Sequence, residues 1–122
     1  MNKILLIPRR LGLLGGIMLI AAILVGSLMP NPPIPEAPNS DKIAHLLGYA
    51  LLSAWWSLNL PKRPWLVFLT GSALGVIIEC LQALTPYRSF DPLDMLANSA
   101  GCLIGLLLAW LLRPCLKVSD HA

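Results

Sequence analysis

The stretch DKIAHLLGYALL (residues 41–52) is mostly apolar and predicts the start of a membrane-spanning helix. Four polar side chains nevertheless lie in its first turns: Asp41, Lys42, His45 and Tyr49. Asp41, His45 and Tyr49 are spaced at i, i+4 and i+8, so they share one face of a helix. Ionisable groups within a membrane span are costly and usually face a partner or a wet cavity. The stretch therefore predicts that other segments bring polar groups to the same level.

The whole chain has the composition of an integral membrane protein. Of its 122 residues, 57% are hydrophobic and only 12% are charged, whereas a soluble domain averages about 25% charged residues. The net charge of +3 is modest, and the basic residues gather in short groups that suit membrane topology better than nucleic-acid binding. The length suits a single domain over residues 1–122. The lipid bilayer is therefore an expected partner, and nucleic acid is not.

Four apolar segments are each near the ~20 residues that cross a hydrocarbon core as a helix. They cover about residues 11–29, 43–60, 65–85 and 93–112. Spanning segments without a barrel pattern must be helical, because lipid offers no partner to backbone polar groups. The sequence therefore predicts an all-α integral membrane bundle of four transmembrane helices. The alternative for the first segment is a cleaved signal peptide, but its apolar core exceeds the usual ~7–15 residues.

The connecting segments are short and rich in proline. PNPPIPEAPNS (residues 30–40) cannot continue a helix and predicts a loop. PKRP (residues 61–64) and PYRSFDP (residues 86–92) predict tight connections between antiparallel helices. The C-terminal KVSDHA is polar, and we expect it to fray.

The distribution of charge predicts the orientation through the positive-inside rule. Seven of the nine basic residues lie on one side of the membrane in this topology, and only Lys42 and Arg88 lie on the other. The seven precede the first segment, separate the second from the third, or follow the fourth: Lys3, Arg9, Arg10, Lys62, Arg63, Arg113 and Lys117. Every acidic residue except Asp120 falls on the other side. We therefore expect a multi-pass protein of the cell (inner) membrane with both termini in the cytoplasm and loop 30–40 outside.

This topology places polar residues of three helices in one shallow layer near the outer face. At ~1.5 Å per residue, His45 lies roughly 5 Å and Glu79 about 9 Å inside the outer helix ends. The remaining members of the layer are Asp41, Lys42, Tyr49, Gln82, Arg88, Asp91, Asp94 and Asn98. We therefore predict a polar pocket that opens outward.

The residue types suggest roles within this pocket. His45 and Glu79 are the candidates for acid–base catalysis, because imidazole titrates near neutrality and a carboxylate within a span marks a functional site. Lys42 and Arg88 are the candidates for holding an anionic lipid headgroup or phosphate. The other predicted substrate-binding residues are Asp41, Tyr49, Gln82, Asp94 and Asn98. The candidate partners of Glu79 are Arg88, Lys42 and His45.

Two further expectations concern Asp91 and metal binding. FDPLD predicts Asp91 as the N-cap of the fourth helix, with Pro92 at its first position. A metal site built from Asp41, His45, Glu79 and Asp94 is chemically feasible. No compact ligand motif supports it, so no metal or cofactor is predicted.

Small and aromatic residues predict how the helices pack. Gly12–Gly16, Gly71–Gly75 and Gly101–Gly105 are G-x-x-x-G pairs, which let apolar helices approach closely. The three cysteines are interpreted as small packing residues rather than as disulfide or zinc ligands: Cys80, Cys102 and Cys115. The tryptophans are expected to form an interfacial belt at the inner helix ends: Trp55, Trp56, Trp65 and Trp110.

Several functions remain open at this point. The polar layer predicts a pocket for a lipid-linked or headgroup substrate at the outer leaflet. The alternative is a non-enzymatic scaffold or partner protein in which the same residues clamp the helices together. A transporter is less favoured, because four short helices leave little room for an alternating-access pathway.

The ordered polar positions within apolar helices resemble the VanZ-like family of small membrane proteins. DKIAHLLGYALL supplies the Asp-Lys-x-x-His-x-x-x-Tyr start of one helix, and ECLQALTPYRSFDPLDMLANSAGCLIG (residues 79–105) supplies the rest. That second part carries Glu-x-x-Gln, an Arg after a proline, two Asp and Asn-x-x-Gly-x-x-x-Gly. The resemblance implies a protein of the bacterial cell membrane, in a family named after a protein associated with glycopeptide (teicoplanin) resistance.

Overall fold

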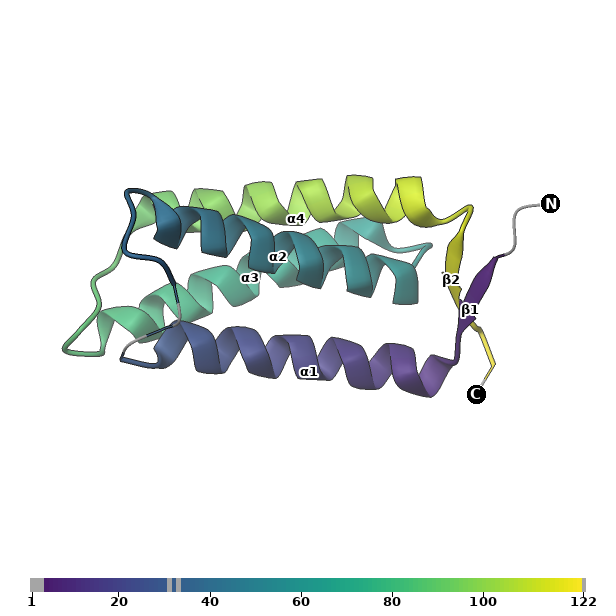
Figure 1. Cartoon of the computed structure of the whole chain (residues 1–122), viewed down its shortest axis with the longest axis horizontal. Coiled ribbons are helices and arrows are strands. Elements are labelled where there is room, and N and C mark those ends of the chain that lie inside the picture. Colours follow the sequence, from purple (N-terminus) through teal and green to yellow (C-terminus); the bar gives the residue numbers. More distant parts are fainter. Residues whose placement is uncertain (1–3, 31, 33, 122) are drawn as a thin grey trace.

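The computed structural model describes residues 4–30, 32 and 34–121, so Lys3 lies outside the described residues. The chain runs back and forth along one long axis, and successive helices are antiparallel (Figure 1). The elements in order are β1 (Leu5–Ile7), α1 (Arg9–Leu28), α2 (Ser40–Asn59), α3 (Pro64–Ala83), α4 (Pro92–Leu112) and β2 (Leu116–Val118). The four predicted helices are therefore confirmed as helices.

Local sequence explains where the helices begin. Pro64 and Pro92 occupy the first turns of α3 and α4, where a missing N–H leaves no helical bond unmade. Asp91 caps α4, because its carboxylate accepts a hydrogen bond of 2.9 Å from the Leu93 amide. The largest difference from the predicted bounds is at α2, which follows Asn39 in a left-handed conformation with φ 60°. Asn tolerates this conformation well, so the loop ends there and the helix begins at Ser40.

Three of the described helices, α1, α3 and α4, are long and apolar enough to cross a membrane. The protein is therefore a membrane protein. Helix α2 is as long as α1, with 20 residues. Asp41, Lys42 and His45 near its start reduce its mean hydropathy.

Helices α2 and α4 pack most closely, and two glycines of α4 make this approach feasible. A Cβ on Gly101 would overlap the carbonyl oxygen of Leu46, and a Cβ on Gly105 would overlap that of Ala50. Tyr49, Leu52 and Cys102 form the buried apolar centre beside this contact. The predicted packing role of the Gly101–Gly105 pair is confirmed.

In the first half of helix α1, glycines accommodate two tryptophans of α2. Gly15 and Gly16 lie against the rings of Trp55 and Trp56, and Trp55 Nε1 donates a 2.7 Å hydrogen bond to the carbonyl of Gly12. Both rings are thus used in helix packing, and the place of Trp55 and Trp56 in an interfacial belt stays a prediction.

The other two tryptophans and the cysteines differ in exposure. Trp65 and Trp110 are exposed on the outside of the bundle, so their place in an interfacial belt stays a prediction. Cys102 is buried as expected, but Cys80 and Cys115 are exposed. The interpretation of Cys80 and Cys115 as small packing residues was therefore wrong. Each lies on a helix face or turn that has no described neighbour to cover it.

The segments beyond α1 and α4 form a two-stranded ribbon that the sequence analysis did not predict. Strands β1 and β2 pair in parallel, with Leu5 opposite Leu116 and Ile7 opposite Val118. Lys117 lies in this ribbon, so the expectation that the whole C-terminal tail frays was wrong. The ribbon joins both chain ends at one end of the bundle, which we call the ribbon end (Figure 1). We call the opposite end, where α2 and α4 begin, the polar end.

Candidate functional site

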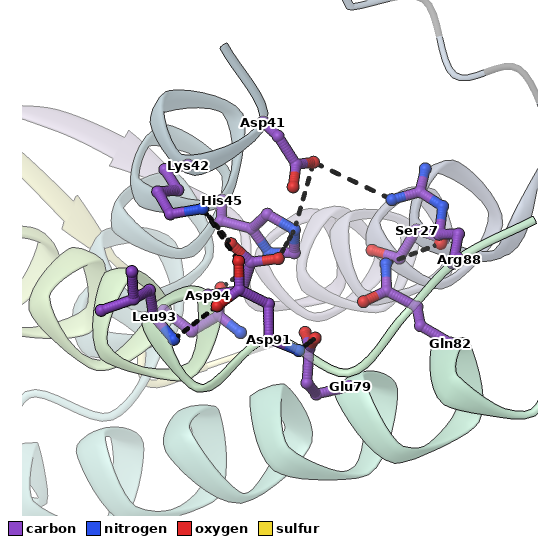
Figure 2. Close-up of polar contacts among 11 residues, drawn as sticks. Ser27, Asp41, Lys42, His45, Glu79, Gln82, Arg88, Asp91, Leu93 and Asp94 are labelled. Atoms are coloured by element: carbon purple, nitrogen blue, oxygen red, sulfur yellow. Dashed lines mark hydrogen bonds and ion pairs between the residues drawn. The ribbon is translucent and has the colours of Figure 1, made fainter. Parts of the chain in front are cut away.

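The predicted polar residues meet at the polar end of the bundle (Figure 2). Helix α2 contributes Asp41, Lys42 and His45; α3 contributes Glu79 and Gln82; the following loop contributes Arg88; α4 and its cap contribute Asp91, Asp94 and Asn98. Five of these side chains are buried: His45, Glu79, Gln82, Asp94 and Asn98. Buried ionisable groups are rare and require partners, so the contacts among them define the site.

His45 lies at the centre of this cluster. Its Nδ1 is 2.8 Å from Oδ1 of Asn98, an arrangement in which the ring N–H donates to the amide oxygen. The other ring nitrogen, Nε2, lies 3.7 Å from both Asp41 Oδ1 and Asp94 Oδ2. Asn98 therefore orients the ring, and Nε2 is the nitrogen positioned to accept or release a proton.

Lys42 joins the beginnings of α2 and α4 through two carboxylates. Its Nζ is 2.9 Å from Asp91 Oδ2 and 3.5 Å from Asp94 Oδ1. The hydrogen bond from Lys42, together with the Leu93 amide, holds the pKa of Asp91 below its ordinary value. Asp91 is therefore both a helix cap and the carboxylate partner of a lysine.

Glu79 has a different partner from those expected. Its side chain is 0% exposed, and its Oε1 accepts a 2.7 Å hydrogen bond from the backbone N–H of Asp91. None of the candidate partners Arg88, Lys42 and His45 makes a hydrogen bond or ion pair with it among the described residues. The second oxygen, Oε2, has no hydrogen-bond partner in that part of the chain either. Glu79 thus fixes the start of α4 and keeps one acceptor oxygen unused.

Gln82 and Tyr49 extend the cluster towards α1 and the core. Gln82 Nε2 donates a 2.8 Å hydrogen bond to the carbonyl of Ser27, which ties α3 to α1. Tyr49 lies one turn below His45 and is 1% exposed. Its hydroxyl has no hydrogen-bond partner within the described residues.

Arg88 projects from the loop between α3 and α4 (Figure 2). Only 14% of its side chain is exposed, and its one ion pair within the described part of the chain is a long contact of 3.9 Å from Nη1 to Asp41 Oδ1. No hydrogen bond from its guanidinium to any described residue is present. A guanidinium carries five N–H donors, so Arg88 retains most of its capacity to bind an anion.

An open cavity of about 780 Å³ lies at the polar end. Arg88, Asp91, Asp94 and Gln82 contribute to one side, and the segment around Glu36 contributes to the other. The described part of loop 30–40 therefore borders the cavity. The site is large enough for a headgroup rather than only for water or an ion.

The metal site considered from the sequence is formed in part. One ligand atom from each of Asp41, His45 and Asp94 lies within 4.8 Å of the others. Glu79, the fourth candidate, is not in this group. Carboxylates and imidazole are suitable ligands for several divalent cations, but Lys42 and Arg88 already neutralise part of the carboxylate charge.

The sequence patterns did not identify the partner of Asp91 or a role for Tyr87. Asp91 was expected in the polar layer and as the cap of α4, and its pairing with Lys42 is the added finding. Tyr87 donates a 2.6 Å hydrogen bond from its hydroxyl to the carbonyl of Leu28. Its position between Pro86 and Arg88 was the available signal.

Comparison with known proteins identifies the family of the chain. The family profile described as VanZ/LLP1 matches residues 1–113, so the chain belongs to the VanZ/LLP1 family. It is 29% identical over 94 residues to the uncharacterized protein C11E3.10 of Schizosaccharomyces pombe (strain 972 / ATCC 24843). The match covers 73% of this chain and 58% of that relative. No solved structure matches the chain.

Proposed function

We propose that this VanZ-family membrane protein binds the anionic headgroup of a lipid-linked substrate at the outer leaflet of the cell membrane. The observation that carries this proposal is Arg88. Its guanidinium is largely buried beside an open cavity, yet among the described residues it makes only one long ion pair. A phosphate or carboxylate could accept two parallel hydrogen bonds from it.

The orientation follows from the charges at the two ends. The described basic residues at the ribbon end include Arg9, Arg10, Lys62 and Arg63, which the positive-inside rule assigns to the cytoplasm. Helix α2 serves as the fourth span in this proposal, because its length equals that of α1 and it packs along α4. The polar end then faces outward in the cell (inner) membrane.

His45 and Glu79 are the groups that we assign to chemistry on the bound headgroup. His45 Nε2 faces two carboxylates and can transfer a proton. Glu79 positions Asp91 and keeps a free acceptor oxygen. Asp41, Lys42, Tyr49, Gln82, Asp94 and Asn98 shape the surrounding site and hold its charges. Because the family is named after VanZ, a cell-envelope lipid is the first substrate to test, and glycopeptide tolerance is the first phenotype. The fission-yeast relative shows that the family also occurs in a eukaryote.

A second candidate function is a structural clamp in a membrane scaffold, and specific contacts favour it. His45–Asn98 joins α2 to α4, Glu79–Asp91 joins α3 to α4, and Gln82–Ser27 joins α3 to α1. In that case the polar residues hold the bundle together and bind nothing.

Lipid retention in nanodiscs separates the two candidates. The purified protein is placed in phosphatidylcholine discs containing a minor fraction of phosphatidic acid, and retained lipids are counted by native mass spectrometry. Arg88→Gln should weaken phosphatidic acid retention about tenfold or more, since a hydrogen bond to a charged group is worth about 1.5–3 kcal/mol. Arg63→Gln, a matched loss of charge at the ribbon end, should have no effect. Equal retention by wild type and Arg88→Gln would contradict headgroup binding.

A further inference from the structure

Two glycines in the helices have no close neighbour, unlike every other glycine of the chain. A Cβ added to Gly26 of α1 or to Gly48 of α2 would meet nothing within 4 Å. At the other glycines it would press against a neighbouring helix, as at Gly75, where Asn98 lies 2.9 Å away. Helix packing therefore explains the other glycines but not Gly26 and Gly48.

Gly26 and Gly48 instead border a cavity of about 220 Å³ between α1 and α2, which we call the α1–α2 slot. Ala22, Ile23 and Ala44 also line its apolar part. The walls of this part are small or aliphatic residues of α1 and α2, whereas Asp41, His45 and Arg88 line the rest. The apolar part suits a hydrocarbon chain and offers little to a polar solute.

The slot adjoins the large cavity at the polar end. Asp41 and Arg88 line both spaces, as do Pro32 and Ile34. His45 lies on the slot side of this junction. A ligand with its anionic group on Arg88 can therefore place an attached chain between α1 and α2.

We propose that the α1–α2 slot binds the hydrocarbon chain next to the phosphate of a single-chain lipid phosphate. The phosphate lies on Arg88, and the start of the chain lies beside Gly26 and Gly48. This inference rests on the proposed function and specifies its substrate class: one chain fits between the two helices, whether straight or isoprenoid. The chain would then extend past Ala22 towards the bilayer.

Photolabelling tests the slot separately from the headgroup site. The probes carry a diazirine a few carbons from the head: a straight-chain alkyl phosphate, an isoprenoid phosphate, and the alkyl alcohol that lacks phosphate. Wild-type protein in phosphatidylcholine nanodiscs is irradiated, and adducts are mapped by peptide mass spectrometry. We expect phosphate-dependent, saturable adducts within residues 22–27 and 44–49. The more efficient of the two phosphate probes identifies the chain type.

Matched variants complete the test. Gly26→Leu and Gly48→Leu place a larger side chain beside the slot, at positions where an added Cβ meets nothing within 4 Å. Leucine also favours the helix, so both variants should fold and lose these adducts at least tenfold. Ala21→Leu adds the same side chain on an exposed position of α1 and should keep them. Saturable, phosphate-dependent labelling that falls elsewhere, or that survives both glycine variants, overturns the slot while leaving headgroup binding intact. If the phosphate probes label no better than the alcohol, the proposed function itself fails and the slot with it.

Discussion

His45 on α2 and Asn98 on α4 face each other across the bundle, with Nδ1 and Oδ1 2.8 Å apart. The two side chains are 53 residues apart in the sequence and both are buried. This contact sets which nitrogen of His45 faces Asp41 and Asp94. It therefore links the packing of α2 on α4 to the chemistry at the polar end.

Asn98→Leu should destabilise the protein, because it leaves the His45 N–H buried without an acceptor. The expected loss is about 1–3 kcal/mol, measured as a lower thermal midpoint in detergent. Asn98→Asp keeps an acceptor oxygen and should lose less stability than Asn98→Leu. If Asn98→Leu is as stable as wild type, the His45–Asn98 bond does not hold the ring in place.

Glu79→Gln should remove function without removing the protein. Glutamine keeps an oxygen that can accept from the Asp91 amide, so the start of α4 should persist, whereas the acidic group is lost. We expect wild type, but not Glu79→Gln, to alter the glycopeptide susceptibility of a sensitive bacterial host at matched membrane levels. A fall in membrane abundance or thermal stability with Glu79→Gln would instead indicate the structural clamp.

The Lys42–Asp91 pair predicts how the stability of the folded protein depends on pH. Because the pKa of Asp91 is lowered in the folded protein, its contribution to stability is present above the ordinary carboxyl pKa of about 4. It is lost as the pH falls through the lowered value. Asp91→Asn retains a good helix cap but lacks this charge. The gap in thermal stability between wild type and Asp91→Asn should therefore be largest near neutral pH and narrow towards pH 3; a constant gap would contradict the pair.

A pair of identical substitutions tests the packing of the helices. Gly105→Ala places a methyl group against the Ala50 carbonyl, whereas Gly26→Ala meets nothing within 4 Å. Overpacking typically costs about 1–3 kcal/mol, so Gly105→Ala should lower the thermal midpoint. Gly26→Ala should leave it unchanged or raise it, because alanine is about 1 kcal/mol better than glycine in a helix. Equal effects would show that α2 and α4 are not in close contact.

The helices and the level of the polar residues could be predicted from the sequence because both depend on local features. Apolar length defines α1, α3 and α4, and counting residues from the helix ends places His45, Glu79 and Asn98 at one depth. The partner of Glu79 could not be predicted, since it is a backbone N–H presented by the turn between α3 and α4.

The pairing of the two strands and the space beside two of the glycines could not be predicted from the sequence either. The pairing of Leu5 with Leu116 joins two three-residue strands at opposite ends of the chain, and segments so short carry no periodicity. Gly26 and Gly48 look like packing glycines in the sequence, and only the arrangement of α1 and α2 distinguishes them from Gly101 and Gly105.

The central claim is that the polar end lies on the outer face of a four-span bundle. It is tested most directly by labelling intact cells with a membrane-impermeant thiol reagent, in a variant whose three cysteines are replaced by alanine. A single cysteine at Pro35, beside the cavity, should react, and one at Lys62, between α2 and α3, should react only after the cells are opened. Reaction at Lys62 alone in intact cells would invert the topology and contradict an outward-facing site.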